Sequence, residues 1–241
     1  MHHTIHNVAQ TGSTNADLLA RLAAGEHLPE GFWLVADRQL AGRGRHGRRW
    51  LDAPGNFMGS TLVHLASMDP AAASLSFVAA LAVYEAVVAR IADPLRLRLK
   101  WPNDVELDGG KLSGILLERE GSHAVIGIGV NLSAAPAVPG RRTGGLAEHG
   151  PPPDRDGFAR ALAATFAQEL ERWRSYGTDP ILARWLAAAH PPGTPLAVHD
   201  CGGAPVAGTF AGLEPDGALR LRLDDGTSRV IHAGDVEAGV S

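Results

Sequence analysis

The sequence is poor in cysteine, in lysine and in long hydrophobic runs, and each shortage argues against a class of protein. Its single cysteine, Cys201, can form neither an internal disulfide nor a cysteine-based zinc site. The opening MHHTIHNVAQ lacks the apolar core of a signal peptide. The longest apolar stretch, residues 77–83, is followed at once by Tyr84 and Glu85 and falls well short of the roughly 20 residues of a membrane span. We therefore expect a cytoplasmic protein without a membrane segment.

The remaining composition is that of a globular protein with modest net charge. The 241 residues are 45% hydrophobic and 20% charged, which argues against disorder, a collagen and a pure coiled coil. A formal net charge of -4 argues against a protein that holds nucleic acid through its overall field. Two of the 22 basic residues, Lys100 and Lys111, are lysines, and the other 20 are arginines. Any basic function must therefore be local, and arginine is the default cation of this chain.

Apolar spacing predicts helices and strands in both parts of the chain. Helices are expected over residues 13–25, 71–91, 158–176 and 181–189, and strands over residues 32–36, 57–65, 95–101, 111–118 and 123–132. A glycine- and proline-rich stretch, residues 136–153, separates the two groups of elements. Four short strands follow Pro191, over residues 196–199, 206–213, 218–223 and 229–232, and they suggest a small barrel. His2, His3 and His6 are expected to form a frayed, exposed end.

An arginine-rich loop, residues 42–50, follows the first predicted strand. Its GRGRHG string matches the G-x-G-x-x-G dinucleotide-binding fingerprint. No helix is predicted after it, however, and that fingerprint needs a helix N-terminus to meet a pyrophosphate, so a nicotinamide-dependent oxidoreductase is disfavoured. Four bidentate oxyanion donors lie instead among three glycines: Arg43, Arg45, Arg48 and Arg49. Such a loop could close on a phosphate or be a solvated basic surface, and the glycines and Trp50 favour function.

A second cluster consists of KWPND, residues 100–104, followed by GGKLSG, residues 109–114. It holds both lysines of the chain, and a lysine retained where arginine serves elsewhere suggests that a compact point charge is needed. Asn103 and Asp104 add an amide and a carboxylate, so the cluster offers cations and polar groups around one site. The alternatives are that the lysines fall together by chance and that Asn103 and Asp104 form a turn.

Two further segments carry residues suited to an uncharged or flat ligand. Ser13, Thr14 and Asn15 can cap a helix, which their spacing favours, or they can pair with an uncharged polar head group. Residues 127–131, GIGVN, form a predicted strand whose two glycines would let a flat ligand approach the backbone. No set of His, Asp or Glu residues has convincing metal spacing, so no metal site is expected.

Taken together, these segments resemble the biotin protein ligases. The matching pieces, in the family's order and with similar spacing over nearly the whole chain, are GSTN at 12–15, residues 39–47 with Trp50, KWPND at 100–104, KLSGIL at 111–116 and GIGVN at 127–131. Related lipoate ligases share the fold but are not expected to combine GRGRHG with KWPND. The resemblance implies an α/β (α+β) fold, with a mixed-sheet catalytic domain of the biotin/lipoate ligase type in residues 1–190 and a small C-terminal SH3-like β-barrel in residues 191–241.

The resemblance also implies a two-step ligation that uses ATP with Mg²⁺. Biotin and MgATP would give biotinyl-5'-AMP and pyrophosphate, and a lysine of biotin carboxyl carrier protein, or of the carrier domain of a biotin-dependent carboxylase, would then take the biotinyl group. Carried over by position, the catalytic residues would be Arg45 and Lys111. The biotin-binding residues would be Ser13, Thr14, Asn15, Gln39, Arg43, Gly44, Arg45, Lys111 and Gly114. The ATP-binding residues would be Arg48, Trp50, Asn103, Asp104, Lys111 and Asn131.

Within that set, Arg45 would hold the adenylate and Lys111 would touch both the biotin carboxylate and the α-phosphate. Asp104 would organise Arg45 or magnesium. Some family members carry a DNA-binding helix-turn-helix before the Ser-Thr-Asn motif, but only twelve residues precede Ser13, so we expect no DNA binding. Dimerisation, which varies in the family, stays open. The alternatives are a lipoate-type ligase of the same fold and a noncatalytic module that binds anions or nucleic acid.

Overall fold

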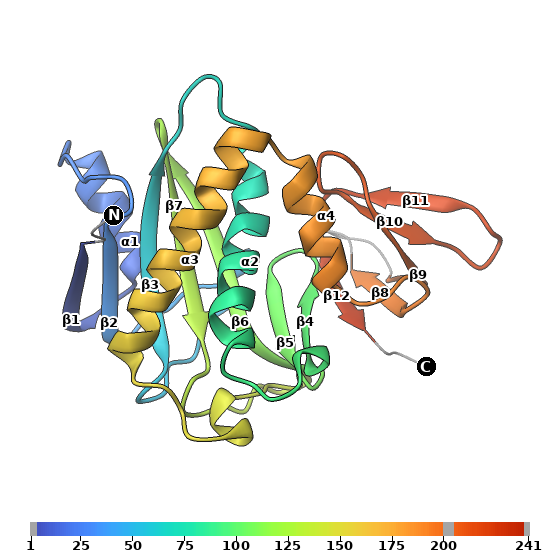
Figure 1. The fold of residues 1–241 in the computed structure, drawn as a ribbon, viewed down its shortest axis with the longest axis horizontal. Helices are drawn as coiled ribbons and strands as arrows, with labels where there is room; N and C mark the ends of the chain where they lie inside the picture. The colour runs from blue at the N-terminus through green and yellow to red at the C-terminus, as the bar shows by residue number, and fades with distance from the viewer. Residues whose placement is uncertain (1–3, 200–204, 239–241) are drawn as a thin grey trace.

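The computed structural model describes residues 4–199 and 205–238, which form two sheets and four α-helices (Figure 1). The larger sheet has the order β1-β2-β3-β7-β6-β5-β4, in which β1 and β2 pair in parallel and the other neighbours are antiparallel. Its strands are β1 (Ile5–Thr11), β2 (Trp33–Gln39), β3 (Phe57–His64), β4 (Leu97–Lys100), β5 (Asp104–Leu107), β6 (Gly110–Glu120) and β7 (His123–Val130). The predicted mixed sheet is thus confirmed. Cys201, His2 and His3 lie outside the described residues.

Helices cover both faces of the large sheet. Helices α2 (Leu75–Val88), α3 (Arg155–Tyr176) and α4 (Asp179–Ala188) lie on one side, and α1 (Thr14–Ala23) lies on the other (Figure 1). Alternation along the strands explains this, since Leu34 and Leu62 pack with Leu18 of α1, whereas Val35 and Val63 belong to the core beneath α2 and α3. No helix within the described ranges combines the length and hydrophobicity that crossing a membrane requires.

Helix α2 is shorter than the helix predicted over residues 71–91. A 3₁₀ turn, Ala72–Ser74, precedes it, and the Ser74 hydroxyl donates to the Ala71 carbonyl at 2.6 Å. Serine side chains compete in this way with regular helical hydrogen bonds, so the α-helix begins only at Leu75. The predicted burial is confirmed, because buried residues occur all around the helix.

Strands β1, β5 and β12 (Asp235–Ala238) are not predicted by the pattern of the sequence. His6 is exposed, as expected, but it is not frayed, because it lies in β1 and pairs with Leu34 of β2. Strand β1 is at the sheet edge and largely exposed, so it lacks the apolar alternation that would predict it. Strand β5 joins β6 through Asp108 and Gly109, which both have positive φ, as in the tight turns of β-hairpins.

The second sheet is antiparallel and has the order β11-β10-β9-β8-β12, where the sequence predicts a small barrel. Its other strands are β8 (Pro195–His199), β9 (Val206–Leu213), β10 (Leu219–Arg222) and β11 (Ser228–Ile231). One buried cluster runs from α2 and α4 into β8, β9 and β10. The Trp101 indole also donates to the Gly217 carbonyl at 3.0 Å. The division into domains near Pro191 therefore stays a prediction.

A buried ionic cluster connects the large sheet to the segment that follows α4. Lys100 Nζ donates to Glu106 Oε1 at 2.7 Å, and His190 Nε2 lies 2.9 Å from Glu106 Oε2. Only 6% of the Glu106 side chain is exposed. Burial raises the pKa of Glu106, but the hydrogen bond with His190 and the charge of Lys100 outweigh it and hold the pKa below its usual value.

Replacing Glu106 by Gln should therefore destabilise the protein in a pH-dependent way. Because the folded-state pKa is lowered, the carboxylate contributes fully above its unfolded-state pKa, and its contribution is lost as pH falls through the folded-state pKa. We expect Glu106→Gln to reduce the free energy of unfolding by about 3 kcal/mol near neutral pH and by less below about pH 4. Urea denaturation at several pH values measures both. Glu214→Gln, at the partly exposed Glu214–Arg220 pair, is the control, and a pH-independent loss in Glu106→Gln would contradict this account.

Candidate functional site

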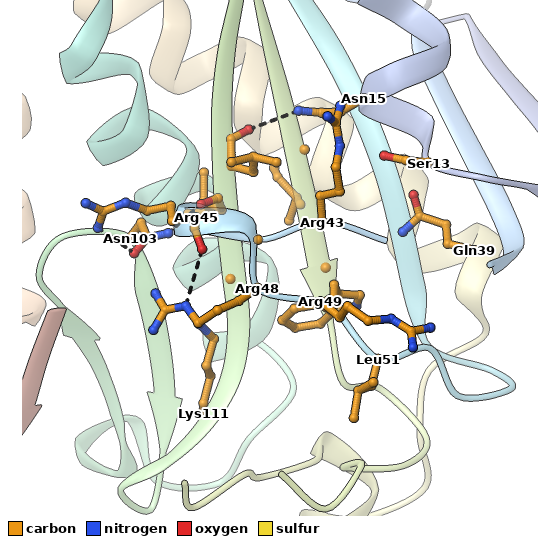
Figure 2. Close-up of a pocket in the computed structure, with 18 of the residues that line it drawn as sticks. Ser13, Asn15, Gln39, Arg43, Arg45, Arg48, Arg49, Leu51, Asn103 and Lys111 are labelled. Carbon is orange, nitrogen blue, oxygen red and sulfur yellow. Dashed lines mark hydrogen bonds between the residues drawn. The ribbon is translucent and has the colours of Figure 1, made fainter. Parts of the chain in front are cut away.

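A cavity of about 360 Å³ lies on the α1 face of the large sheet, within the size range of small-molecule sites (Figure 2). All the residues predicted for the site line it except Asp104. They come from the start of α1, the end of β2 and the segment after it, strand β6, the position just after β7 and the loop between β4 and β5. Figure 2 shows Ser13, Asn15 and Gln39 on one side of the cavity and Arg45 and Lys111 on the other.

One end of the cavity is a buried network of uncharged polar side chains. Thr14 donates from its backbone N and its Oγ1 to Gln39 Oε1, at 2.8 and 3.1 Å. Its hydroxyl lies 2.6 Å from Ser60 Oγ, which in turn donates to Asn15 Oδ1 at 2.6 Å. Ser13 caps α1, as predicted. The shared hydrogen bonds fix these groups in advance, so this end is suited to an uncharged polar head group.

Three glycines make room for two of the lining side chains. An added Cβ at Gly127 would lie 2.9 Å from Asn15 Cγ, and one at Gly129 would lie 2.7 Å from Trp50 Nε1. The Trp50 ring also lies 3.1 Å from the same position on Gly114. The sequence predicted that a ligand would approach the backbone of residues 127–131. In the structure the Asn15 and Trp50 side chains lie over Gly127 and Gly129, and they line the cavity themselves.

The charged residues among the described lining are all cationic: Arg43, Arg45, Arg48, Arg49, Lys111 and Arg141. Three of them are each held by a carboxylate outside the lining: Arg43 by Glu118 at 3.4 Å, Arg48 by Asp235 at 2.6 Å and Lys111 by Asp104 at 2.6 Å. Within residues 4–199 and 205–238, no group of three or more His, Cys, Asp or Glu residues could hold a metal ion. The cationic side of the cavity is therefore suited to an anion.

The arginine-rich loop is folded rather than extended. A 3₁₀ turn, Arg45–Gly47, interrupts it, Gly44 N donates to Arg48 O at 2.7 Å, and Trp50 N donates to Gly42 O at 2.9 Å. No helix follows before β3, which agrees with the rejection of a dinucleotide-binding fingerprint. The arrangement brings the loop arginines to the cavity on a short backbone hairpin.

The C-terminal sheet contacts this loop directly. Arg48 Nη2 donates to Asp235 Oδ1 at 2.6 Å, and Arg45 Nη1 lies 3.4 Å from both Gly234 O and Asn103 Oδ1. Burial raises the pKa of Asp235, but its hydrogen bond with Arg48 and the nearby positive charges lower the pKa below its usual value. Sequence reasoning could not find Gly234 and Asp235, because they are about 190 residues from the loop in the chain.

Asp235→Asn should loosen the arginine-rich loop. It weakens the ion pair with Arg48. Because this pair is partly exposed, it stabilises the loop by at most about 1 kcal/mol, so we expect the amides of Gly44 and Trp50 to exchange up to about fivefold faster. Hydrogen-exchange mass spectrometry measures this. Asp225→Asn, in an exposed turn of the same sheet, is the control. Unchanged exchange in Asp235→Asn would show that the C-terminal sheet does not restrain the loop.

The two lysines lie in different parts of the structure. Lys111 lines the cavity, and its Nζ donates to Asp104 Oδ1 at 2.6 Å. Lys100 is outside the described lining and is engaged by Glu106, so the expectation that both cations surround one site was wrong for Lys100. The Asp104 carboxylate, expected to organise Arg45 or magnesium, accepts this bond from Lys111, and its expected role stays a prediction. The cause is the β4–β5–β6 pairing, which places Asp104 and Lys111 on adjacent strands.

Several lining residues were missed. They are Leu51, Gly59, Ser60, Ile115, Leu116, Pro136, Val138, Arg141 and Thr143. The last four belong to a loop that we define as residues 134–145 and that the sequence marked only as glycine- and proline-rich. Asn131 holds its far end, since Nδ2 donates to Lys111 O at 3.2 Å and to Gly144 O at 3.1 Å. The adjacent pair Arg141 and Arg142 was the one available signal of function.

Comparison with known proteins agrees with these features. Residues 9–131 match the Biotin/lipoate A/B protein ligase family, and residues 197–239 match the Biotin protein ligase C terminal domain. The chain is 42% identical to a biotin--[acetyl-CoA-carboxylase] ligase of Paracoccus denitrificans, over 96% of this chain and 99% of that protein. It is 34% identical to the bifunctional ligase/repressor BirA of Escherichia coli, over 88% of this chain and 67% of that one.

The fold agrees as well. The structure of biotin protein ligase from Aquifex aeolicus in complex with biotin and ATP superposes with a TM-score of 0.84 at 26% identity and covers 99% of both chains. The match includes the C-terminal sheet, where the predicted SH3-like module falls. On the sequence and the fold together, the chain belongs to the biotin protein ligases, within the biotin/lipoate A/B protein ligase family.

Proposed function

We propose that this chain is an ATP-dependent ligase that attaches biotin to a specific lysine of biotin carboxyl carrier protein through biotinyl-5'-AMP. One observation carries the proposal: a single cavity joins a buried, uncharged polar network to a lining whose charged residues are all cationic. Biotinyl-5'-AMP has the same order, with an uncharged ureido ring, an apolar tail and a phosphate anion. The relatives that are named biotin--[acetyl-CoA-carboxylase] ligases support this substrate.

At the polar end, Ser13, Thr14, Asn15 and Gln39 would bind the ureido ring of biotin. A buried polar ring must find partners, and the fixed network offers hydroxyl and amide groups without reorganisation. The tail would lie along the part of the lining formed by Gly44 and Gly114, with Arg43 beside it. This orientation directs the biotin carboxylate toward Lys111.

In the first step a carboxylate oxygen of biotin attacks the α-phosphorus of ATP, and the bond to the leaving pyrophosphate breaks. Lys111 would touch both anions and so reduce their repulsion as they approach. Asp104 would hold the ammonium in place through its 2.6 Å contact. Arg48, Trp50, Asn103 and Asn131 would bind the nucleotide. Magnesium enters with its phosphates as the MgATP co-substrate.

In the second step the acceptor lysine amine attacks the biotinyl carbonyl carbon, and AMP leaves. Arg45 would retain the mixed anhydride until the acceptor arrives. The acceptor is a carrier protein or carrier domain of a biotin-dependent carboxylase. We propose a cytoplasmic location for the enzyme. We propose no DNA binding, because the net charge is -4 and the arginine-rich loop lines a small-molecule cavity. A homodimer is compatible with this proposal.

Arg45→Gly should therefore release biotinyl-5'-AMP prematurely. The substitution removes the guanidinium and its contacts with Asn103 and Gly234, so containment should weaken more than synthesis. Free adenylate reacts with exposed amines, and labelling of bystander lysines on added albumin should rise. Streptavidin blotting measures it. Arg119→Gly, an exposed arginine outside the cavity, is the control, and labelling confined to the normal acceptor in Arg45→Gly would place containment elsewhere.

The most direct test of the first step is biotin-dependent pyrophosphate release from MgATP. The proposal predicts release with biotin and much less with lipoate. Release with lipoate alone would favour the lipoate-type ligase of the same fold. Binding of ATP or of nucleic acid without any release would favour a noncatalytic module.

A further inference from the structure

Arg141 stands at the rim of the cavity on a backbone that is fixed beside Lys111. The loop of residues 134–145 returns along the start of β6, where Lys111 N donates to Arg142 O at 2.9 Å and Gly144 N donates to Lys111 O at 3.0 Å. Gly110 permits this approach, since an added Cβ there would lie 2.9 Å from Thr143 O. The Arg141 side chain is exposed and yet lines the cavity, which places it at the opening.

Arg141 also differs from the other lining cations in its contacts. Three of them are paired with carboxylates, Arg45 bonds to Asn103 and Gly234, and Arg49 bonds to the Leu40 carbonyl. The Arg141 side chain makes no hydrogen bond or ion pair with any residue of the described part of the chain. Its charge does reach the Arg48–Asp235 pair. Burial raises the pKa of Asp235, Arg48 and then His46 lower it, and Arg141 lowers it further by a smaller amount.

We propose that Arg141 binds the β- and γ-phosphates of ATP and the pyrophosphate that leaves. This inference rests on the proposed function. A guanidinium without a partner among the described residues can pair with an arriving phosphate without breaking an ion pair there, and its fork suits two phosphate oxygens. Pyrophosphate must also depart through the opening, where Arg141 lies. Once it has left, the adenylate keeps a single phosphate, so Arg141 serves the first step and not the second.

The test compares Arg141→Gln with Arg142→Gln. Arg142 is adjacent, exposed and outside the described lining, so its loss controls for a change of charge on the same loop. For Arg141→Gln we expect the KM for ATP in biotin-dependent pyrophosphate release to rise about tenfold. This factor corresponds to the low end of the free energy contributed by a hydrogen bond to a charged group. The KM for biotin and the transfer rate from preformed biotinyl-5'-AMP should change by less than about twofold, and Arg141→Lys should recover part of the loss.

Inorganic pyrophosphate provides a second readout that a merely structural role would not move. Product inhibition by added pyrophosphate should weaken about tenfold in Arg141→Gln and stay unchanged in Arg142→Gln. Equal values in wild type and Arg141→Gln, or equal losses in the two variants, would overturn the inference while leaving the ligase proposal intact. If the wild-type protein releases no pyrophosphate with biotin, the proposed function and this inference both fall.

Discussion

Lys111→Arg should lose adenylation almost as completely as Lys111→Ala. The ammonium forms a 2.6 Å contact with Asp104, and its Nζ and Cε lie 3.2 and 3.1 Å from the position that a Cβ on Gly114 would occupy. A guanidinium is a wide planar fork, so it would need room that this site gives only to a compact charge. We expect both variants to lose on the order of 10²–10³ in kcat, the usual cost of removing a donor aimed at transition-state charge. Biotin-dependent pyrophosphate release measures the loss.

Two controls separate this role from a structural one. The rate of transfer from preformed biotinyl-5'-AMP should fall less than the rate of adenylation, because the phosphate is then already part of the leaving group. Lys100→Arg, at the chain's other lysine, should keep adenylation within about twofold, since arginine can also pair with Glu106 outside the cavity. Near-native adenylation by Lys111→Arg would show that Lys111 is only a structural cation.

Gly129→Ala should disable the nucleotide end of the cavity. Strand β7 lies between β3 and β6, so its backbone cannot move aside, and the added methyl carbon would lie 2.7 Å from Trp50 Nε1. The indole must therefore leave its place over β7. Overpacking of this kind costs about 1–3 kcal/mol, and we expect ATP use in the adenylation step, measured as kcat/KM, to fall roughly tenfold to hundredfold.

A double-mutant cycle tests whether this effect acts through the ring. Because Trp50→Ala already removes the indole, adding Gly129→Ala to it should cause little further loss. Gly157→Ala in α3, where the nearest atoms to the new methyl group belong to the Asp154 and Arg160 side chains at 3.3 Å or more, is the control for protein stability. Additive losses in the double variant would mean that Gly129 contributes through something other than Trp50.

The parts of this protein that local pattern encodes could be predicted from sequence. Helix α1, the buried helix α2 and strand β3 follow from cap residues and apolar spacing, because these are consequences of neighbours along the chain. The resemblance predicted one shared site for the motif residues. They do line one cavity, with the exception of Asp104. Their roles in binding and catalysis stay predictions.

The missed features depend on contacts between distant segments. Ser60 is an ordinary strand residue until α1 places Thr14 and Asn15 against it. The engagement of Lys100 by Glu106 follows from strand pairing, and that of Arg48 by Asp235 depends on the C-terminal sheet folding back on the arginine-rich loop. Periodicity and motif spacing carry no information about such pairings, so structure is needed to separate the cation that lines the cavity from the one that does not.

The central claim is tested most directly by transfer of labelled biotin to a carrier. The wild-type chain, labelled biotin, MgATP and a purified biotin carboxyl carrier domain are incubated together, and the carrier's mass is measured with and without its acceptor lysine. The account predicts the addition of one biotinyl group, dependent on ATP, absent when that lysine is replaced by arginine and lost in Lys111→Ala. Transfer of lipoate in place of biotin, or binding of biotin with no labelled carrier under any of these conditions, would contradict it.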